Sequence, residues 1–299
     1  MAMTVNSSSG WLRSTLLGLM ILYAVAATLP LLRVLPSQFV VAANILPPAL
    51  FAFLHGSWIY RLRGMLAFTA TSLVIGNVAE QLGIRTGFPF GSYYFTDVMG
   101  PKLLGVPLLM GPAYLAIGYT SWLLALLIGG GANRTRPNRL AVPLLAACIM
   151  VVWDLSAEAM WSTVGHFWIW RHGGPYFGVP IWNFVGWLLT NYAIFQSFTF
   201  YLSRRPEAAV SVGLSHWRLG LLSYAIVILA GLARSVAIFR LGRFADAAGV
   251  QWAAQDIALS SAMVSFFVMG PIALAAWVRI SHSGAARQAT GKLAENLAR

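Results

Sequence analysis

The chain has 299 residues, of which 59% are hydrophobic and only 9% are charged. A soluble globular domain carries nearer a quarter charged residues, so this composition excludes a mainly soluble protein and indicates one integral membrane domain over residues 1–299. The net charge of +12 would favour nucleic acid as a partner of a soluble protein. Here the Lys and Arg residues lie between apolar runs, where they set topology, so we expect no nucleic-acid binding.

Apolar runs bounded by charge, Pro or Gly predict an all-α, polytopic transmembrane bundle of about eight helices. In chain order the expected helices are residues 14–32, 38–59, 65–82, 104–128, 140–161, 181–202, 217–239 and 256–280. The first run could instead be a signal peptide, because Ala24-Val25-Ala26 resembles a cleavage site, and seven spans would then remain. Its apolar character continues to Leu32, so we expect a retained helix.

Basic residues divide unevenly between the two sides of this arrangement. Thirteen lie at the N-terminus, in the second-to-third, fourth-to-fifth and sixth-to-seventh loops, at Arg279 and in a short basic tail at 281–299, whereas the other four loops hold six. Positive charge favours the cytoplasm, so we expect both termini there, in a multi-pass protein of the inner (plasma) membrane. The third-to-fourth and fifth-to-sixth loops then face outward.

The two outward loops resemble each other. Glu80 leads through an aromatic loop to Gly105-Val106-Pro107, and Glu158 leads in the same way to Gly178-Val179-Pro180. A repeated two-helix unit would explain this match, and chance in a Gly-rich chain would also explain it.

Three of the eight acidic residues, Glu80, Asp154 and Glu158, fall inside expected spans. A carboxylate there costs roughly 2.5 to 3.5 kcal/mol and normally faces a cavity or a partner, so these three are candidate catalytic residues. The alternative is a hydrogen bond or ion pair that holds helices together. Asp154 and Glu158 are four residues apart on one helix face, and two like charges so placed do not both ionise easily. One of them could stay protonated and act as a general acid. Helix rise places Glu80 at a similar depth.

Aromatic residues are dense around these acids. Aromatic side chains at a membrane interface often form only a belt, but ring faces also stabilise positive charge, as an enzyme that protonates an alkene would require. The candidate substrate-binding residues are Tyr93, Tyr94, Trp153, Trp161, Trp170, Asn183 and Trp187. Asn183 could orient water or an acid.

Other chemistries are disfavoured. The five His residues form no HxxH or HxxxH pair, so we expect no metal site of the di-iron hydroxylase type. Asp154 and Glu158 make a lone DxxxE without the second acidic element that would hold a diphosphate through magnesium. Neither a phosphate-binding nor a dinucleotide-binding glycine motif is present. We therefore expect no cofactor.

Four stretches carry a family resemblance: EQLGIRTGFPFGSYYF from Glu80, GVPLLMGPAYL from Gly105, WDLSAEAMW from Trp153 and WIWRHGGPYFGVPIWNFVGW from Trp168. With these, the chain resembles the carotenoid biosynthesis membrane proteins that include bisanhydrobacterioruberin hydratase and γ-carotene 1′-hydratase. The resemblance covers the middle third to half of the chain.

The resemblance implies addition of water to the terminal C1=C2 bond of an acyclic carotenoid, giving a tertiary alcohol without metal or redox cofactor. On that interpretation Asp154 or Glu158 is the acid and Glu80 positions or deprotonates the water. The lipid bilayer surrounds the protein, and neighbouring carotenoid-pathway enzymes are candidate partners. Two rival hypotheses remain: a lipid or isoprenoid transporter or binding protein, and an isoprenoid cyclase or isomerase.

Overall fold

The computed structural model describes residues 8–32, 37–130, 138–205 and 212–282, and the expected basic tail lies mostly outside them. The α-helices are α1 (Ser8–Leu32), α2 (Ser37–Thr86), α3 (Met110–Gly130), α4 (Ala141–Ala159), α5 (Ile181–Arg204), α6 (Leu214–Ile238) and α7 (Ala254–Val264). Within the described ranges, six helical segments are long and apolar enough to cross a membrane, and α5 is not among them. The predicted helical membrane protein is thus confirmed in outline.

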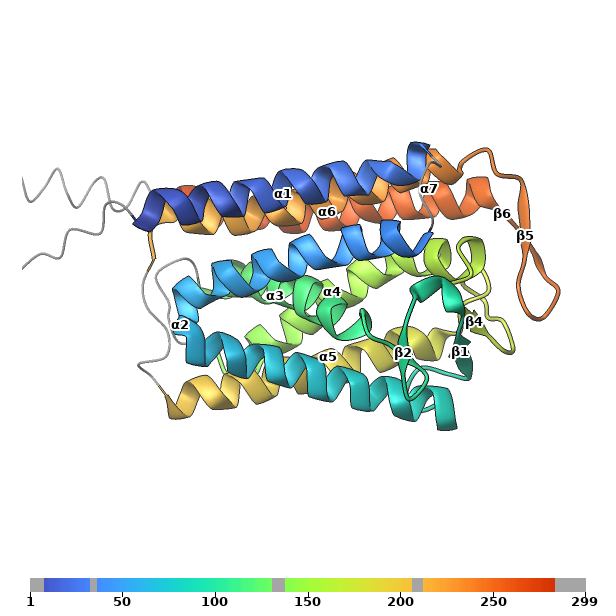
Figure 1. Ribbon diagram of the computed structural model, residues 1–299, viewed down its shortest axis with the longest axis horizontal. Helices are drawn as coiled ribbons and strands as arrows, with labels where there is room; N and C mark the ends of the chain where they lie inside the picture. The colour runs from blue at the N-terminus through green and yellow to red at the C-terminus, as the bar shows by residue number, and fades with distance from the viewer. Residues whose placement is uncertain (1–7, 33–36, 131–137, 206–211, 283–299) are drawn as a thin grey trace, which may run out of the picture.

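The second and third expected helices are the two halves of α2. The backbone of Arg61 is non-helical, with φ 54° and ψ 173°, and the chain reverses direction there. A side chain at Gly56 would meet the sulfur of Met65, two positions that a straight helix would hold far apart. Figure 1 shows the two halves running alongside each other from the break.

Several expected boundaries are wrong, and the first helix begins at Ser8, six residues before the expected start at residue 14. The fourth helix begins at Met110 instead of residue 104, because β2 (Lys102–Leu103) and β3 (Val106–Pro107) form a hairpin before it. The third extends to Thr86, four residues beyond the expected end. The fifth continues past Ala159 as a π-helical turn, η2 (Met160–Val164). The last is α7, a π-helical turn η4 (Ser265–Met269) and a further helical stretch at 270–282.

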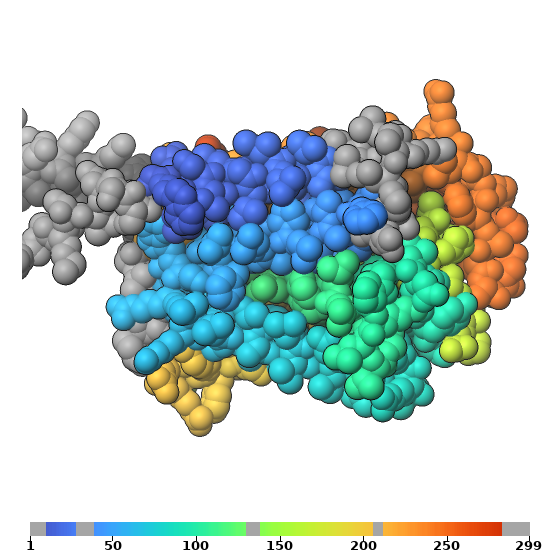
Figure 2. Space-filling model, in the orientation of Figure 1, coloured from blue at the N-terminus to red at the C-terminus, as the bar shows by residue number. Residues whose placement is uncertain are grey.

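The helices lie roughly parallel or antiparallel in two groups (Figure 1). α1, α6 and α7 form one group, and α2 to α5 form the other. α3 is the centre of the bundle, since 83% of its apolar stretch is buried, against 28% for α1. On the face seen in Figure 2, side chains of α3 are visible in a strip between the two halves of α2.

The short strands lie together at one end of the bundle (Figure 1). β1 (Tyr93–Phe95) pairs antiparallel with β4 (Trp168–Trp170), so the two aromatic loops join directly. β5 (Arg243–Ala245) and β6 (Gln251–Ala253) form a separate hairpin at the same end. These elements, with the 3-10 turn η1 (Asp97–Met99), close that end of the helices.

The resemblance between the two aromatic loops extends to the backbone. Leu104 and Gly105 have φ of 53° and 89°, and Phe177 and Gly178 have φ of 52° and 89°. Each pair forms the centre of a tight reversal, between Leu103 and Val106 in one loop and between Tyr176 and Val179 in the other. Two positive φ values in succession define a type I′ turn. The two units, each with a helix, a strand, a hairpin and a helix, are therefore structural repeats.

Candidate active site

The three acidic residues expected inside the membrane are all buried at the end of the bundle that the aromatic loops close. Glu80 is 3% exposed, and Asp154 and Glu158 are each 2% exposed. Glu80 comes from the second half of α2, whereas Asp154 and Glu158 lie one turn apart on α4. Their side chains interact electrostatically across the two helices. The structure therefore brings together the three acids that the sequence singled out.

Glu80 accepts hydrogen bonds from two tyrosines. The hydroxyl of Tyr93, in β1, donates to Oε2, and the hydroxyl of Tyr114, in α3, donates to Oε1 at 2.8 Å. Burial, followed by the charge of Glu80, raises the pKa of Tyr93 well above its usual value near 10, so this hydroxyl stays protonated and keeps donating. Tyr114 was missed by sequence reasoning because it lies in an apolar run.

Glu158 accepts from the second aromatic loop. The indole Nε1 atoms of Trp168 and Trp170 both donate to Oε1 of Glu158, at 2.7 and 2.8 Å. Both come from β4, where alternate side chains point to the same face. Tyr93 lies directly opposite Trp170 in the paired strand. One face of this small sheet therefore supplies hydrogen-bond donors to Glu80 and to Glu158.

Among the described residues, one side chain other than the acids donates to Asp154, through Nδ2 of Asn183 at 2.7 Å. Asn183 lies in the first turn of α5, which its hairpin directs toward α4. The π-helical turn η2 begins two residues after Glu158, and such turns are frequent at functional sites. Asp154 therefore receives fewer hydrogen bonds than the two glutamates.

Two adjacent cavities meet at the acids. The main cavity contains about 740 Å³ of space free of atoms, including its open part, and is lined by Asp154 and Glu158. The side cavity contains about 270 Å³ by the same measure and is lined by Glu80 and Glu158. Both include Trp187 in their walls, so Glu158 and Trp187 lie where the cavities adjoin.

Most of the predicted substrate-binding residues line these cavities. Trp153 and Trp161 line the main cavity, Tyr93, Trp170 and Asn183 line the side cavity, and Trp187 lines both. Tyr94 does not join them: it is 43% exposed on the other face of β1, where the guanidinium of Arg171 lies 5.0 Å from its ring centroid. The alternation of the strand separates Tyr94 from Tyr93, which the sequence interpretation had grouped together.

Other residues of the cavity come from parts of the chain that sequence reasoning did not connect with the acids. Tyr23 of α1 and Asn44 of α2 line the main cavity, and so does Arg234 of α6. Among the described residues, Arg234 forms no ion pair with a carboxylate. Its guanidinium instead lies 5.6 Å from the ring centroid of Trp161.

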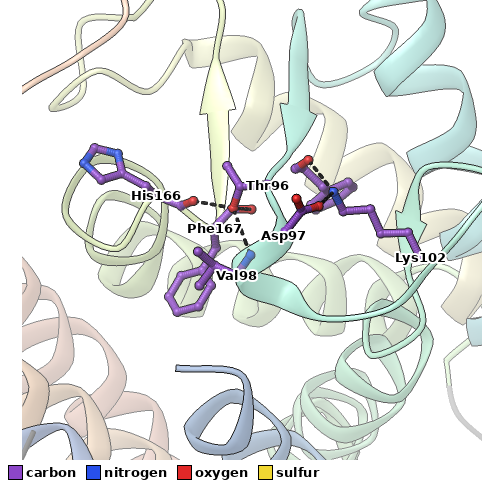
Figure 3. Close-up of polar contacts among 7 residues, drawn as sticks. Thr96, Asp97, Val98, Lys102, His166 and Phe167 are labelled. Atoms are coloured by element: carbon purple, nitrogen blue, oxygen red, sulfur yellow. Dashed lines mark hydrogen bonds and ion pairs between the residues drawn. The ribbon is translucent and has the colours of Figure 1, made fainter. Parts of the chain in front are cut away.

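The two aromatic loops are also tied together beside the paired strands (Figure 3). The hydroxyl of Thr96 donates to the carbonyl oxygens of His166, at 2.6 Å, and Phe167, at 3.1 Å. On the other side, Lys102 pairs with Asp97 at 2.7 Å, which lowers the pKa of that exposed carboxyl. These contacts hold the two aromatic loops in place over the cavities.

The chain is similar to known carotenoid biosynthesis proteins. The family model described as "Carotenoid biosynthesis protein" matches residues 19–248. A curated relative, the bisanhydrobacterioruberin hydratase of Haloarcula japonica, is 32% identical over 143 residues. That stretch is 48% of this chain and 47% of the relative, so the match spans about half of each protein. No solved structure matches at a significant level.

Proposed function

The chain belongs to the carotenoid biosynthesis protein family, and from this premise we propose that it is a carotenoid hydratase. The proposed reaction adds water to the terminal C1=C2 bond of an acyclic carotenoid end and gives a tertiary alcohol. The observation that carries the proposal is the group of three buried carboxyl groups at two adjoining cavities with aromatic walls. The name of the relative from Haloarcula japonica supports the same class of reaction.

The first step is protonation of the alkene by Asp154. A carboxyl group that accepts many hydrogen bonds is favoured as the anion. Glu80 and Glu158 each accept two from ring donors, whereas Asp154 accepts one from Asn183. Asp154 is therefore the member of the group best suited to hold a proton. Transfer to C2 forms the new C–H bond, and the electron pair of the double bond is consumed in it.

Protonation at C2 leaves the positive charge on the tertiary carbon C1. Trp153 and Trp187 line the main cavity with Asp154, and their ring centroids are 5.9 Å apart. Aromatic faces attract a cation by roughly 0.5 to 2 kcal/mol each, more where water is excluded. The rings therefore lower the energy of the intermediate without reacting with it.

The second step is capture of the cation by water. As the water oxygen bonds to C1, Glu80 takes a proton from it, so no net charge is left on the product. The proton gained by Glu80 then has to return to Asp154. Glu158 lines both cavities and interacts electrostatically with the other two acids, which makes it the natural relay. The cycle is redox-neutral and consumes one water molecule.

The setting of the enzyme is part of the proposal. We place the protein in the plasma membrane with both termini in the cytoplasm, so that the three acids lie near the outer face of the membrane. The long apolar substrate lies between helices with one end in the main cavity. No metal or redox cofactor takes part, and enzymes that supply acyclic carotenoids are its functional neighbours.

Two other functions use the same features differently. A transporter or binding protein would hold an isoprenoid without changing its mass, and a cyclase or isomerase would protonate the alkene without adding water. The hydrogen-bond donors that converge on two of the carboxyls favour proton chemistry over transport. A gain of the mass of water separates the hydratase from both alternatives, and a changed pigment structure at unchanged mass separates a cyclase or isomerase from a transporter.

The test is expression of the gene in cells that make an acyclic carotenoid, with the pigments analysed by mass spectrometry. Wild type should add the mass of water, and Glu80→Gln, Asp154→Asn and Glu158→Gln should each reduce the hydrated product by about 10²-fold or more, the usual contribution of general acid–base groups. Asp256→Asn, at the exposed start of α7, is the matched control and should hydrate normally. Normal hydration by all three site variants would refute the mechanism.

A further inference from the structure

Three residues that line the main cavity hold buried polar atoms without a hydrogen-bond partner among the described residues. They are Oδ1 of Asn44, Nε1 of Trp161 and Nε of Arg234. Buried polar atoms are nearly always paired in folded proteins, because an unmade hydrogen bond is costly, and an unpaired one calls for a ligand or water. The mechanism above uses none of these three atoms.

The three side chains line one cavity but come from α2, η2 and α6. The guanidinium of Arg234 lies 5.6 Å from the ring centroid of Trp161 and interacts electrostatically with Tyr23 of α1. Asn44 is tied to Ala26, which lies one helical turn beyond Tyr23. Polar side chains from elements that are far apart in the sequence thus line the same cavity.

The existing hydrogen bonds of Asn44 determine which atom of its amide is free to bind a ligand. Nδ2 of Asn44 donates to the carbonyl oxygens of Ala26, at 3.1 Å, and of Val40, at 2.8 Å. These two bonds prevent the amide from flipping, so its free atom is the acceptor Oδ1. The indole and guanidinium nitrogens can only donate. The three unpaired atoms are therefore two donors and one acceptor.

Two donors and one acceptor can be paired completely by only some chemical groups of a ligand. A carboxylate or ionised phosphate could accept from Arg234 but has no proton to donate to Oδ1 of Asn44, and it would share the cavity with Glu158, which the proposed mechanism keeps as an anion. A ketone could accept from the two donors but would leave Oδ1 unpaired. A hydroxyl accepts two hydrogen bonds and donates one, which satisfies all three atoms.

We propose that Asn44, Trp161 and Arg234 form a hydroxyl site that binds the alcohol group of an isoprenoid in the main cavity. The choice of an isoprenoid skeleton rests on the proposed function, because hydration yields a tertiary alcohol at the end of such a chain. The site recognises the hydrated end by its oxygen, and the aromatic wall holds the apolar chain.

The test is competition binding to purified, immobilised protein at constant detergent composition, which needs no turnover. The labelled probe is tetrahydromyrcenol, a short acyclic isoprenoid tertiary alcohol. The competitors are the unlabelled alcohol, the alkene from which it forms by hydration, and a carboxylic acid of similar length. The alcohol should compete at about a tenfold lower concentration than the alkene, the effect expected of well-placed hydrogen bonds.

Variants assign the preference to the three side chains. Trp161→Phe and Arg234→Met should weaken alcohol binding to the level of the alkene, a loss larger than any change in alkene binding. Thr199→Val is the control, because its hydroxyl bonds to Phe195 within its own helix. If Arg234→Met fails to fold, Trp161→Phe, which removes one N–H and keeps a ring, decides the matter.

Two results would overturn the hydroxyl site. Equal competition by alcohol and alkene would mean that the three atoms hold only water, and tighter binding of the acid would mean an anion site. Failure here is distinct from failure of the proposed function. A protein that prefers the alcohol but yields no hydrated pigment would refute the hydratase and keep the hydroxyl site. A protein that yields hydrated pigment but binds alcohol and alkene equally would refute the hydroxyl site and keep the hydratase.

Discussion

The ring of Tyr114 in α3 stacks on the ring of Trp187 in α5, with centroids 5.1 Å apart and planes 13° from parallel. Each is the ninth residue after the glycine of its Gly-Val-Pro motif, Gly105 or Gly178. They occupy equivalent positions in the two repeats, so the stack is where the repeats meet. Tyr114 also donates to Glu80, which links this contact to the acids.

The repeats are chemically unequal at one position. Four residues before Glu158 lies Asp154, whereas four residues before Glu80 lies Gly76. A side chain at Gly76 would come within 2.9 Å of the ring of Tyr114, so the stack leaves no room for an acid there. A symmetric pair of glutamates thus has a third acid on one side only, which fits the different roles proposed for acid and base.

The hydrogen bond from Tyr114 to Glu80 predicts that Tyr114→Phe lowers hydration while keeping the stack. A hydrogen bond to a charged group is worth about 1.5 to 3 kcal/mol, so loss of this one should slow product formation by about tenfold or more. The measurement is the rate of hydrated pigment formation per amount of folded protein. Tyr119→Phe is the control, since its hydroxyl pairs with His55 instead. Equal rates in both variants would contradict a role for the bond.

Trp187 borders both cavities, which predicts a specific need for its ring. Trp187→Leu should slow hydration by about 30-fold, because a desolvated ring stabilises a cation by about 2 kcal/mol, whereas Trp187→Phe should keep most of the rate. Trp122→Leu removes another buried indole, which stacks on Phe195. It should lower the unfolding temperature without changing the rate per folded molecule. Similar rates for the two leucine variants would argue against cation stabilisation by Trp187.

The sequence was sufficient to group the acids, and the reason is energetic. A carboxylate inside a span needs a partner or a cavity, so Glu80, Asp154 and Glu158 stood out, and charge counting and helix rise put them at one end. The hairpin before α3 was missed, because the apolar character of residues 104–109 favoured a helix over the turn at Leu104 and Gly105.

The contribution of α1 and α6 to the cavity could not be predicted from hydropathy. An apolar run shows that a segment crosses the membrane but not which helices it packs beside. Tyr23, Asn44 and Arg234 are far apart in the sequence, and only the packing of α1 against α2 and α6 places them on one cavity. The contribution of these residues to the cavity can therefore be seen only in the tertiary structure.

The hydroxyl of Thr96 predicts that the two aromatic loops act as one cover. Thr96→Val keeps the shape of the side chain but removes its bonds to His166 and Phe167, at a cost of about 1 to 2 kcal/mol. Hydrogen exchange should become faster at residues 87–109 and 165–180 together. Thr71→Val, which loses only a bond to Phe68 within its own helix, should leave both loops protected. Faster exchange in one loop alone would mean that the strand pairing holds each loop independently.

The charge distribution predicts which end of the bundle faces the cytoplasm. The strands lie at one end, and α2 breaks at Arg61 at the other, so a single cysteine placed at each end reports the orientation (Figure 1). In a Cys148→Ala background, Tyr94→Cys is on the exposed face of β1 and Arg63→Cys is exposed near the break. A membrane-impermeant maleimide added to intact cells should label Tyr94→Cys and should reach Arg63→Cys only after lysis, because basic residues are retained inside. The Cys148→Ala protein alone gives the background signal. The opposite labelling pattern would invert the topology and move the carboxyl groups to the cytoplasmic side, leaving the arrangement of the acids itself unchanged.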